Sequence, residues 1–231
     1  GFLFIFVDVL IYMSAERASF FFLNLSTIFI IILIKEYQKF RLVTFITAII
    51  FIFVLSINSQ NLSDRMFKGP AKNMGLIKNS NSNNESTIFS PTHDSLIRTA
   101  YNMFKDQPLL GHGPKMFRVI CNDKKYQQGI TPCDTHPHNF YIQLLAETGI
   151  IGFLFLVSAL AYVLFAATRQ IKSIIFKQKR PLSDYQVCLL AGILISLWPI
   201  TTNGNFFHNW LMIVYSLPVG FYLQSIYSKN N

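Results

Sequence analysis

Long apolar stretches alternate with short charged clusters along this chain, and one long hydrophilic stretch interrupts them. A membrane-spanning helix needs about 20 mostly apolar residues. Six stretches are candidates for such helices: residues 1–13, 18–34, 42–57, 140–168, 186–200 and 206–226. The fourth is too long for one simple span, so we expect its first ten residues to form an amphipathic entry at the membrane surface. The chain opens inside an apolar stretch without an initiator Met, so we expect an N-terminal truncation that has removed earlier spans.

The composition supports a membrane protein and argues against a nucleic-acid partner. Hydrophobic residues make up 52% of the chain and charged residues only 13%, whereas soluble domains carry roughly 25% charged residues. The net charge is +9, but ten of the 20 basic residues lie in the hydrophilic stretch beside six acidic ones, and eight more flank apolar stretches. Such a distribution is typical of membrane orientation rather than of nucleic-acid binding, and it predicts contact with lipid.

Two short loops predict the orientation. Residues 35–41 carry three basic side chains and residues 169–185 carry five, each with one acidic side chain. Both are therefore expected in the cytoplasm. Alternation then gives an all-α, multispan integral membrane protein: three helices in residues 1–57, an outer, partly helical loop in residues 58–137, and three helices with a cytoplasmic C-terminus in residues 138–231.

The outer loop divides into two different halves. Residues 74–92 are rich in Asn and Ser with little to bury, so we expect this segment to be mobile. Residues 93–105 place apolar side chains at helical spacing and predict a helix. Residues 108–114 then break that helix with a Gly-His-Gly-Pro turn.

Two cysteines of the outer loop, Cys121 and Cys133, are separated by eleven residues. In an oxidising compartment this pair favours a disulfide, with two free thiols as the alternative. A metal site formed by these cysteines with His136 and His138 is a further alternative, but the closely spaced Cys or His pairs of zinc sites are absent from these positions. We therefore expect no metal ligands here.

The segment Thr-His-Pro-His-Asn-Phe-Tyr-Ile-Gln-Leu-Leu-Ala-Glu-Thr-Gly-Ile-Ile-Gly at residues 135–152 carries the most chemical information. His138 stands where the polar loop meets an apolar helix. Asn139, Gln143 and Glu147 follow at intervals of four residues, so they share one helical face. Polar groups near a membrane usually face a cavity or one another. The plainer alternative is that His138 and Asn139 only cap the helix at the lipid headgroups.

These residues resemble the bacterial O-antigen ligase and polymerase family. The family signature is His-Asn, nine residues and Gly, which here is His138-Asn139 and Gly149 within Glu-Thr-Gly-x-x-Gly. Arg98 precedes Asp-Gln-Pro-Leu-Leu-Gly-His-Gly and is similar to the family's Arg before Pro-Leu-x-Gly-x-Gly. Arg17, in Ser-Ala-Glu-Arg, resembles the family's outer arginine, although an acidic residue stands where a small one is usual. The likeness covers roughly residues 10–165.

The predicted orientation, which rests on Lys and Arg counts alone, places Arg17, Arg98 and His138 on the same outer face. The resemblance implies a GT-C-like, metal-independent glycosyltransferase without a cofactor, located in the bacterial inner membrane with its active face toward the periplasm. Its implied partners are a polyprenyl-diphosphate-linked glycan donor and an acceptor that is either lipid A core, for a ligase, or another lipid-linked glycan, for a polymerase.

The implied chemistry gives these residues roles. His138 is expected to act as the general base, because imidazole titrates near neutral pH. Arg17 and Arg98 are expected to bind the diphosphate, because guanidinium groups form paired hydrogen bonds with phosphate and keep their charge. His136, Asn139 and Glu147 are expected to contact substrate, with Asn139 or Glu147 orienting the imidazole. A single in-line attack would invert the anomeric centre.

Two other classes of protein compete with this interpretation. A transporter or flippase of lipid-linked saccharides predicts ionisable residues near mid-membrane and an inverted repeat; apart from Asp8 and Glu147, the sequence provides neither. A metallohydrolase predicts His-Glu-x-x-His, which is also absent. The sequence favours the transferase, and it does not separate a ligase from a polymerase.

Overall fold

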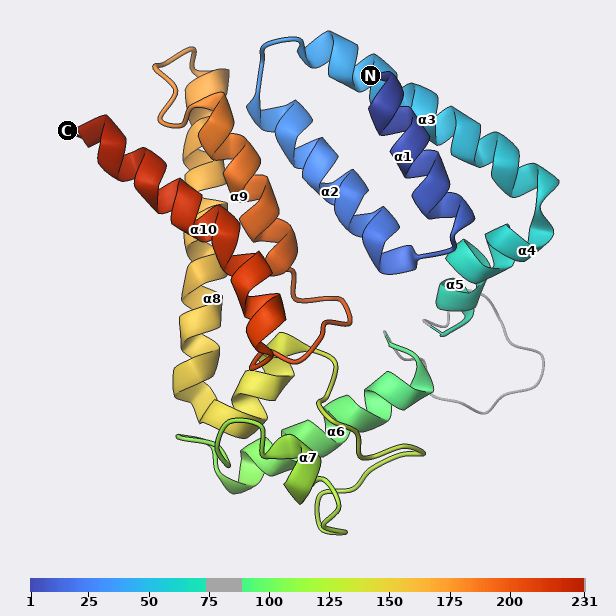
Figure 1. The fold of residues 1–231 in the computed structure, drawn as a ribbon, viewed down its shortest axis with the longest axis vertical. Coiled ribbons are helices and arrows are strands. Elements are labelled where there is room, and N and C mark those ends of the chain that lie inside the picture. Colours follow the sequence, from blue (N-terminus) through green and yellow to red (C-terminus); the bar gives the residue numbers. More distant parts are fainter. Residues whose placement is uncertain (74–88, 231) are drawn as a thin grey trace. The chain divides into compact units, whose positions relative to one another are not determined.

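The computed structural model describes residues 1–73 and 89–230, and throughout this part of the chain the regular elements are helices (Figure 1). In chain order they are α1 Phe2–Met13, α2 Arg17–Leu33, α3 Gln38–Asn58, α4 Gln60–Ser63, a π-helix Asp64–Lys68, α5 Gly69–Asn73, α6 Pro91–Asp106, α7 Phe117–Ile120, α8 Phe140–Ile175, α9 Asp184–Ser196 and α10 Asn209–Asn230. The prediction of an all-α protein is confirmed.

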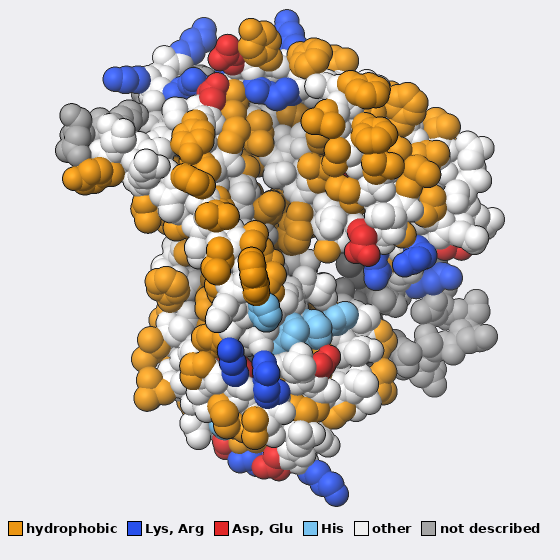
Figure 2. All heavy atoms as spheres, viewed as in Figure 1, with side chains coloured by type: hydrophobic (Ala, Val, Ile, Leu, Met, Phe, Trp, Pro, Cys, Tyr) orange, Lys and Arg blue, Asp and Glu red, His pale blue; other side chains and the backbone are white. Residues whose placement is uncertain are grey.

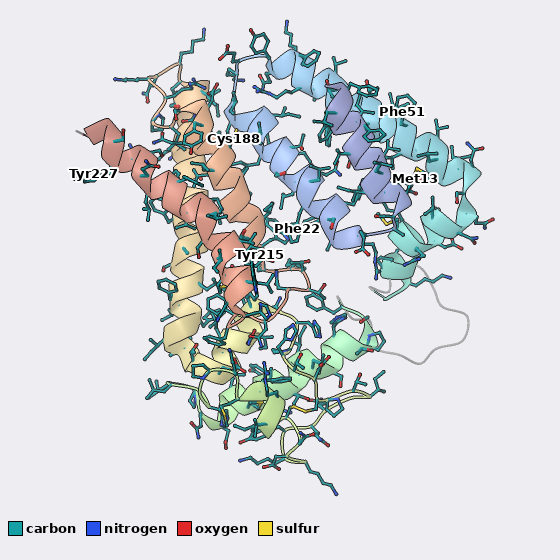
Figure 3. The ribbon with its side chains drawn as sticks, viewed as in Figure 1. Met13, Phe22, Phe51, Cys188, Tyr215 and Tyr227 are labelled. Atoms are coloured by element: carbon teal, nitrogen blue, oxygen red, sulfur yellow. A yellow bond between two sulfur atoms is a disulfide. The ribbon has the colours of Figure 1, made fainter. Side chains whose placement is uncertain are left out.

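Three of these helices, α3, α8 and α10, are long and apolar enough to cross a membrane, and α1, α2 and α9 are shorter apolar helices. Large apolar side chains cover their outer surfaces: Phe51 on α3, for example, is 53% exposed (Figure 3). Exposed apolar surface on this scale marks a surface that contacts membrane or protein. The chain is therefore an α-helical membrane protein.

Local sequence explains where several helices begin and end. The helix predicted at residues 93–105 is confirmed as α6, which Ser90 caps and Pro91 begins. In α8, Gly149 adopts a non-helical backbone conformation, so the helix breaks where the ten-residue entry segment ends. The helix α9 ends at Ser196, shortly before Pro199, because the residue before a proline disfavours helical geometry. The expectation for residues 74–92 falls mostly on residues outside the described part of the chain.

The contacts between residues divide the chain into two compact units, and the boundaries of these units differ from those of the three segments predicted from sequence. Unit 1 comprises residues 1–69, 162–196 and 217–231, and unit 2 comprises residues 70–161 and 197–216. In unit 1, helix α1 packs on α3 and α2 packs on α9. Tyr12 is fully buried, and its hydroxyl bonds Ser56 Oγ at 2.6 Å, linking α1 to α3. Asn24 Nδ2 donates to the buried Asp8 Oδ1 at 2.9 Å, linking α2 to α1.

Two apolar clusters lie among the described residues of unit 2. One forms between α6, α7 and the first part of α8 around Leu96, Met103 and Phe117. The other surrounds Phe140 and Leu144 near the start of α8, where the Phe140 ring lies 5.7 Å from the ring of Tyr215 on α10 (Figure 3). These clusters hold the two ends of the polar segment that runs from α6 to α8.

Cys188, the third cysteine, lies on α9 in unit 1 (Figure 3). An apolar span predicts a buried thiol there, but the structure exposes it at the protein surface. That prediction is wrong, since an apolar helix at a lipid-facing surface need not bury its small side chains.

Candidate active site

Asn139 starts α8 and anchors it to the segment before α10. Its side-chain oxygen accepts hydrogen bonds from the backbone N–H groups of Tyr141 at 3.0 Å and Ile142 at 3.2 Å. This is the N-cap arrangement that satisfies the first free donors of a helix. Its side-chain nitrogen donates to the carbonyls of Pro199 at 2.8 Å and Thr201 at 3.2 Å. One buried side chain therefore fixes the residue that follows His138.

Gln143 and Glu147 continue this anchoring along the same face of α8, and both are fully buried. Gln143 Nε2 donates to Glu147 Oε2 and to Asn205 Oδ1, each at 2.9 Å, and Gln143 Oε1 accepts the N–H of Phe206 at 2.9 Å. Glu147 Oε1 accepts the N–H of Phe117 at 2.8 Å. The polar stripe of the sequence thus joins α8 to α7 and to Pro199, Thr201, Asn205 and Phe206 in the segment before α10.

His138 projects from the loop immediately before this cap. Its backbone is left-handed, with φ of 56°, and its carbonyl accepts the N–H of Asn203 at 2.7 Å. The imidazole is 30% exposed, and its Nε2 lies 3.2 Å from Asp134 Oδ2. The carboxylate that contacts the imidazole is therefore that of Asp134, whereas the hydrogen bonds of Asn139 and Glu147 run to other partners.

Two more imidazoles lie against His138. The His136 ring is 4.1 Å away, centroid to centroid, and tilted by 42°. The His93 ring, from the first turn of α6, is 5.2 Å away and nearly perpendicular at 86°. Figure 2 shows histidine side chains gathered on one face, with Lys and Arg side chains beside them. We call His93, His136 and His138 the imidazole cluster.

Charges around the imidazole cluster are set by burial and by hydrogen bonds. The backbone N–H of Thr135 holds the pKa of Asp134 below its usual range, opposed by burial, and the hydrogen bond from His138 lowers it further. Burial lowers the pKa of His136 below 6.5, and repulsion by His138 adds to the effect. Arg118 contributes a smaller repulsion in the same direction. At neutral pH an ionised Asp134 therefore lies beside the imidazole cluster, in which His136 is neutral.

Two glycine-containing segments, residues 108–113 and 146–150, are joined by backbone hydrogen bonds. We call this contact the Gly149 junction. The N–H groups of His112 and Gly113 donate to the carbonyls of Ala146 and Glu147, at 3.0 and 2.8 Å, and the N–H of Ile150 donates to Pro108 at 2.8 Å. Gly149 has φ of 66°, and a Cβ there would overlap the Leu109 carbonyl. The glycines thus allow two backbones to pack closely across the break in α8.

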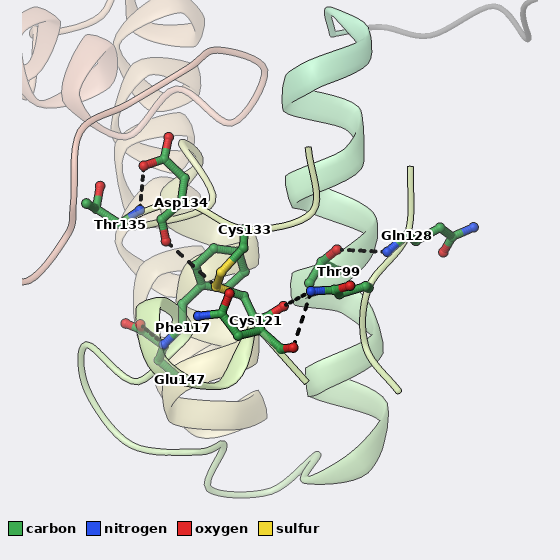
Figure 4. The surroundings of a disulfide bond; sticks show 10 residues. Thr99, Phe117, Cys121, Gln128, Cys133, Asp134, Thr135 and Glu147 are labelled. Atoms are coloured by element: carbon green, nitrogen blue, oxygen red, sulfur yellow. Dashed lines mark hydrogen bonds between the residues drawn. A yellow bond between two sulfur atoms is a disulfide. The ribbon is translucent and has the colours of Figure 1, made fainter. Parts of the chain in front are cut away.

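A disulfide joins Cys121 and Cys133 beside this network, with Cα atoms 5.1 Å apart (Figure 4). Cys121 follows α7 and is fully buried, whereas Cys133 precedes Asp134 in the chain. Since Glu147 also accepts the N–H of Phe117 at the start of α7, Figure 4 shows α7 held to α8 on one side and to the 133–135 segment on the other. The segment that carries Asp134 is therefore covalently tied to the fold.

The two predicted arginines lie in different units. Arg98, in unit 2, is partly exposed on α6, where its Nε pairs with Asp94 Oδ2 at 2.6 Å. Arg17, in unit 1, is exposed in the first turn of α2. A cation at a helix N-terminus opposes the helix dipole, so Arg17 is not placed there for the stability of α2. Within unit 2, the structure brings His136 and His138 together with His93.

Three residues of the site were missed by sequence reasoning. Asp134 precedes His138 by four residues in a Pro-rich loop, so its spacing was a usable signal. His93 and Asn203 come from distant segments, and neither residue carries a local signal of its role. The Asn203 carbonyl accepts a hydrogen bond from His136 Nε2 at 3.3 Å. The Asn203 side-chain oxygen is buried and has no hydrogen-bond partner among the described residues.

The fold and the site together define an α-helical membrane protein with a histidine-centred polar site in a loop unit. The family model described as O-antigen ligase matches residues 1–157, which is more than half of the chain. The chain therefore belongs to the O-antigen ligase family, as the His-Asn motif indicated. Comparisons with curated proteins and with solved structures give no match.

Proposed function

We propose that this protein transfers a glycan from a polyprenyl-diphosphate carrier to a hydroxyl of an acceptor sugar at the periplasmic face of the bacterial inner membrane. Membership of the O-antigen ligase family implies a glycosyltransferase-like enzyme acting on a lipid-linked glycan and an acceptor in general terms. The observation that carries the specific proposal is the pairing of His138 with Asp134 in an accessible position directly before α8.

In the proposed step, His138 is the general base. The Asp134 carboxylate accepts a hydrogen bond, so it favours the imidazole tautomer with its proton on Nε2 and leaves Nδ1 as the proton acceptor. The acceptor hydroxyl attacks the anomeric carbon as its proton passes to Nδ1. The bond from the anomeric carbon to the phosphate oxygen breaks, and the diphosphate leaves with the bonding electrons. This single displacement inverts the anomeric centre.

The leaving diphosphate gains negative charge, which Arg98 and Arg17 are proposed to neutralise. A guanidinium group can form two parallel hydrogen bonds to phosphate oxygens, and it keeps its charge at every relevant pH. These groups would provide the charge stabilisation for which other transferases use a metal ion. Asn139 and Glu147 contribute by holding the helix that follows His138, and His136 by its contact with the His138 ring.

Substitution of His138 and of Arg98 by Ala tests the proposal. Each variant should lose glycan transfer while its amount in the membrane stays unchanged, because both side chains are partly exposed and neither belongs to an apolar cluster. Transfer is measured in membranes with lipid-linked saccharide extracted from cells that lack the protein. Full activity in either variant would refute the role assigned to that residue.

The same cells separate a ligase from a polymerase. Loss of a polymerase leaves single repeat units on the carrier, whereas loss of a ligase leaves finished polymers. The chain length of the accumulated saccharide, resolved by gel electrophoresis or mass spectrometry, therefore identifies the acceptor class.

A further inference from the structure

We infer that His93 is a positioning residue of the transfer site, which fixes the plane of the His138 ring. The inference rests on the proposed role of His138 as the base. It starts from a contact that the sequence does not suggest: His93 lies 45 positions before His138 in the chain, yet the two imidazoles meet edge to face with centroids 5.2 Å apart.

The position of His93 is itself well fixed. Its Nδ1 lies 2.7 Å from Ser90 Oγ, the N-cap oxygen of α6. Further along α6, Ser95 Oγ donates to the Gln128 carbonyl at 2.5 Å, and Thr99 Oγ1 accepts the Gln128 N–H at 3.2 Å. Leu96, Ala100 and Met103 bury the inner face of the helix. The first turn of α6 therefore presents His93 from a rigid support.

His138 needs such a support. It lies outside any helix and is 30% exposed, and its hydrogen bond to Asp134 fixes one point of the ring. Because Nε2 lies close to the axis of the Cβ–Cγ bond, the ring can still turn about that bond while this hydrogen bond is kept. His93, perpendicular to the ring, and His136, tilted by 42° beside it, restrict this rotation from two sides. A base must direct its lone pair at the attacking hydroxyl, so the plane of the ring determines its efficiency.

The same helix offers a contrast in Arg98. It follows His93 by five residues, which at about 100° per residue places it roughly 140° further around the helix. Its guanidinium pairs with Asp94 of the same helix, and both side chains are partly exposed. The ring contact between α6 and His138 is made by His93.

Three variants of His93 test this inference in membranes supplied with saccharide-carrying lipid from cells that lack the protein. In His93→Ala, kcat should fall by about 10- to 100-fold, as for a misplaced catalytic group, while KM for the lipid changes by less than about threefold. His93→Phe, which keeps a ring edge, should restore kcat to within about threefold of the unmodified protein. His93→Gln, which keeps polarity without a ring, should behave like His93→Ala.

Tyr101→Ala is the matched control, because it removes an exposed aromatic ring from the same helix and should leave kcat unchanged. Formation of the Cys121–Cys133 disulfide in each variant, measured by thiol labelling, verifies that unit 2 has folded. Full kcat in His93→Ala would overturn the inference, as would a rescue by Gln and not by Phe.

His138→Ala is measured in parallel, so the two proposals fail separately. If His138→Ala is inactive and His93→Ala is fully active, the positioning role is wrong and the proposed function stands. If His138→Ala keeps full activity, the base is misassigned and the positioning role falls with it.

Discussion

At the residue scale, Asp134 makes the hydrogen bond that distinguishes His138 from an ordinary interfacial histidine. Replacing its carboxylate by an amide keeps the shape of the side chain but removes the charge and permits the wrong imidazole tautomer. Asp134→Asn should therefore lower kcat by roughly 10- to 100-fold, by analogy with the loss of a hydrogen-bond partner that orients a metal-ligating histidine. Steady-state transfer kinetics give the result, and an unchanged kcat would show that Asp134 does not orient the base.

His136 makes the stability of unit 2 depend on pH. Its pKa in the folded protein lies below the ordinary 6.5, mainly because of burial. As pH falls through 6.5, the unfolded chain binds this proton more readily than the folded one, so stability is lost on acidification and is fully present at higher pH.

Hydrogen exchange of the backbone around residues 136–139 and 203 should thus become faster at pH 5.5 than at pH 7.5, after correction for the intrinsic rate. His136→Gln, which has no titrating ring, should reduce this difference. An equal pH dependence in both proteins would contradict the assignment to His136.

Individual residues also show what sequence can and cannot reveal. The pattern correctly placed Asn139, Gln143 and Glu147 on one helical face, because helical periodicity is local. It did not show that their amide and carboxylate groups bond to residues 117 and 199–206, since those partners are distant in the chain. The contact between His93 and His138 depends in the same way on how α6 packs, which no local spacing encodes.

At the element scale, the Gly149 junction joins a loop to a broken helix through three backbone hydrogen bonds. Gly149→Ala should lower the free energy of unfolding by about 2 kcal/mol or more, because an L-residue with positive φ alone costs roughly 1–2 kcal/mol and the new methyl group overlaps Leu109. The unfolding midpoint in detergent should fall by roughly 4–8 °C.

Gly220→Ala in α10 is the matched control. A Cβ there meets no atom within 4 Å, so the same change should be neutral or stabilise by about 0.5–1 kcal/mol through helix propensity. Size-exclusion chromatography after heating measures both midpoints. Equal midpoints for the two variants would show that the Gly149 backbone is not constrained as described.

Helices themselves were the most predictable elements. Apolar stretches located all six apolar helices, although the predicted end of the fourth falls seven residues short of the end of α8, and the helical spacing of residues 93–105 located α6. The sequence also indicated a break in the fourth apolar stretch from its excessive length. What it could not show was that the Pro-Leu-Leu-Gly-His-Gly turn fills that break, because pairing between two irregular backbones leaves no periodic pattern.

At the scale of the whole molecule, the predicted orientation places the imidazole cluster and Arg17 on the outer side of the membrane. Single cysteines in place of Glu16 and Arg118, both exposed, should react with a membrane-impermeant maleimide in intact spheroplasts. Cysteines in place of Lys39 and Lys177, in the basic loops, should react only after permeabilisation. A Cys188→Ser background removes the exposed native thiol. Labelling of Arg118→Cys solely from the cytoplasmic side would end the proposed orientation.

The Gly149 junction also limits how members of this family can be recombined. Residues 108–113 of the loop and residues 146–150 of α8 pack backbone against backbone, so the conformation of each segment fits the other. A chimera that grafts a foreign outer loop onto this chain would have to import residues 140–152 along with it. A splice at residue 137 would separate residues 108–113 from residues 146–150 and would lose the hydrogen bonds between them. A splice beyond residue 152 would transfer both segments together.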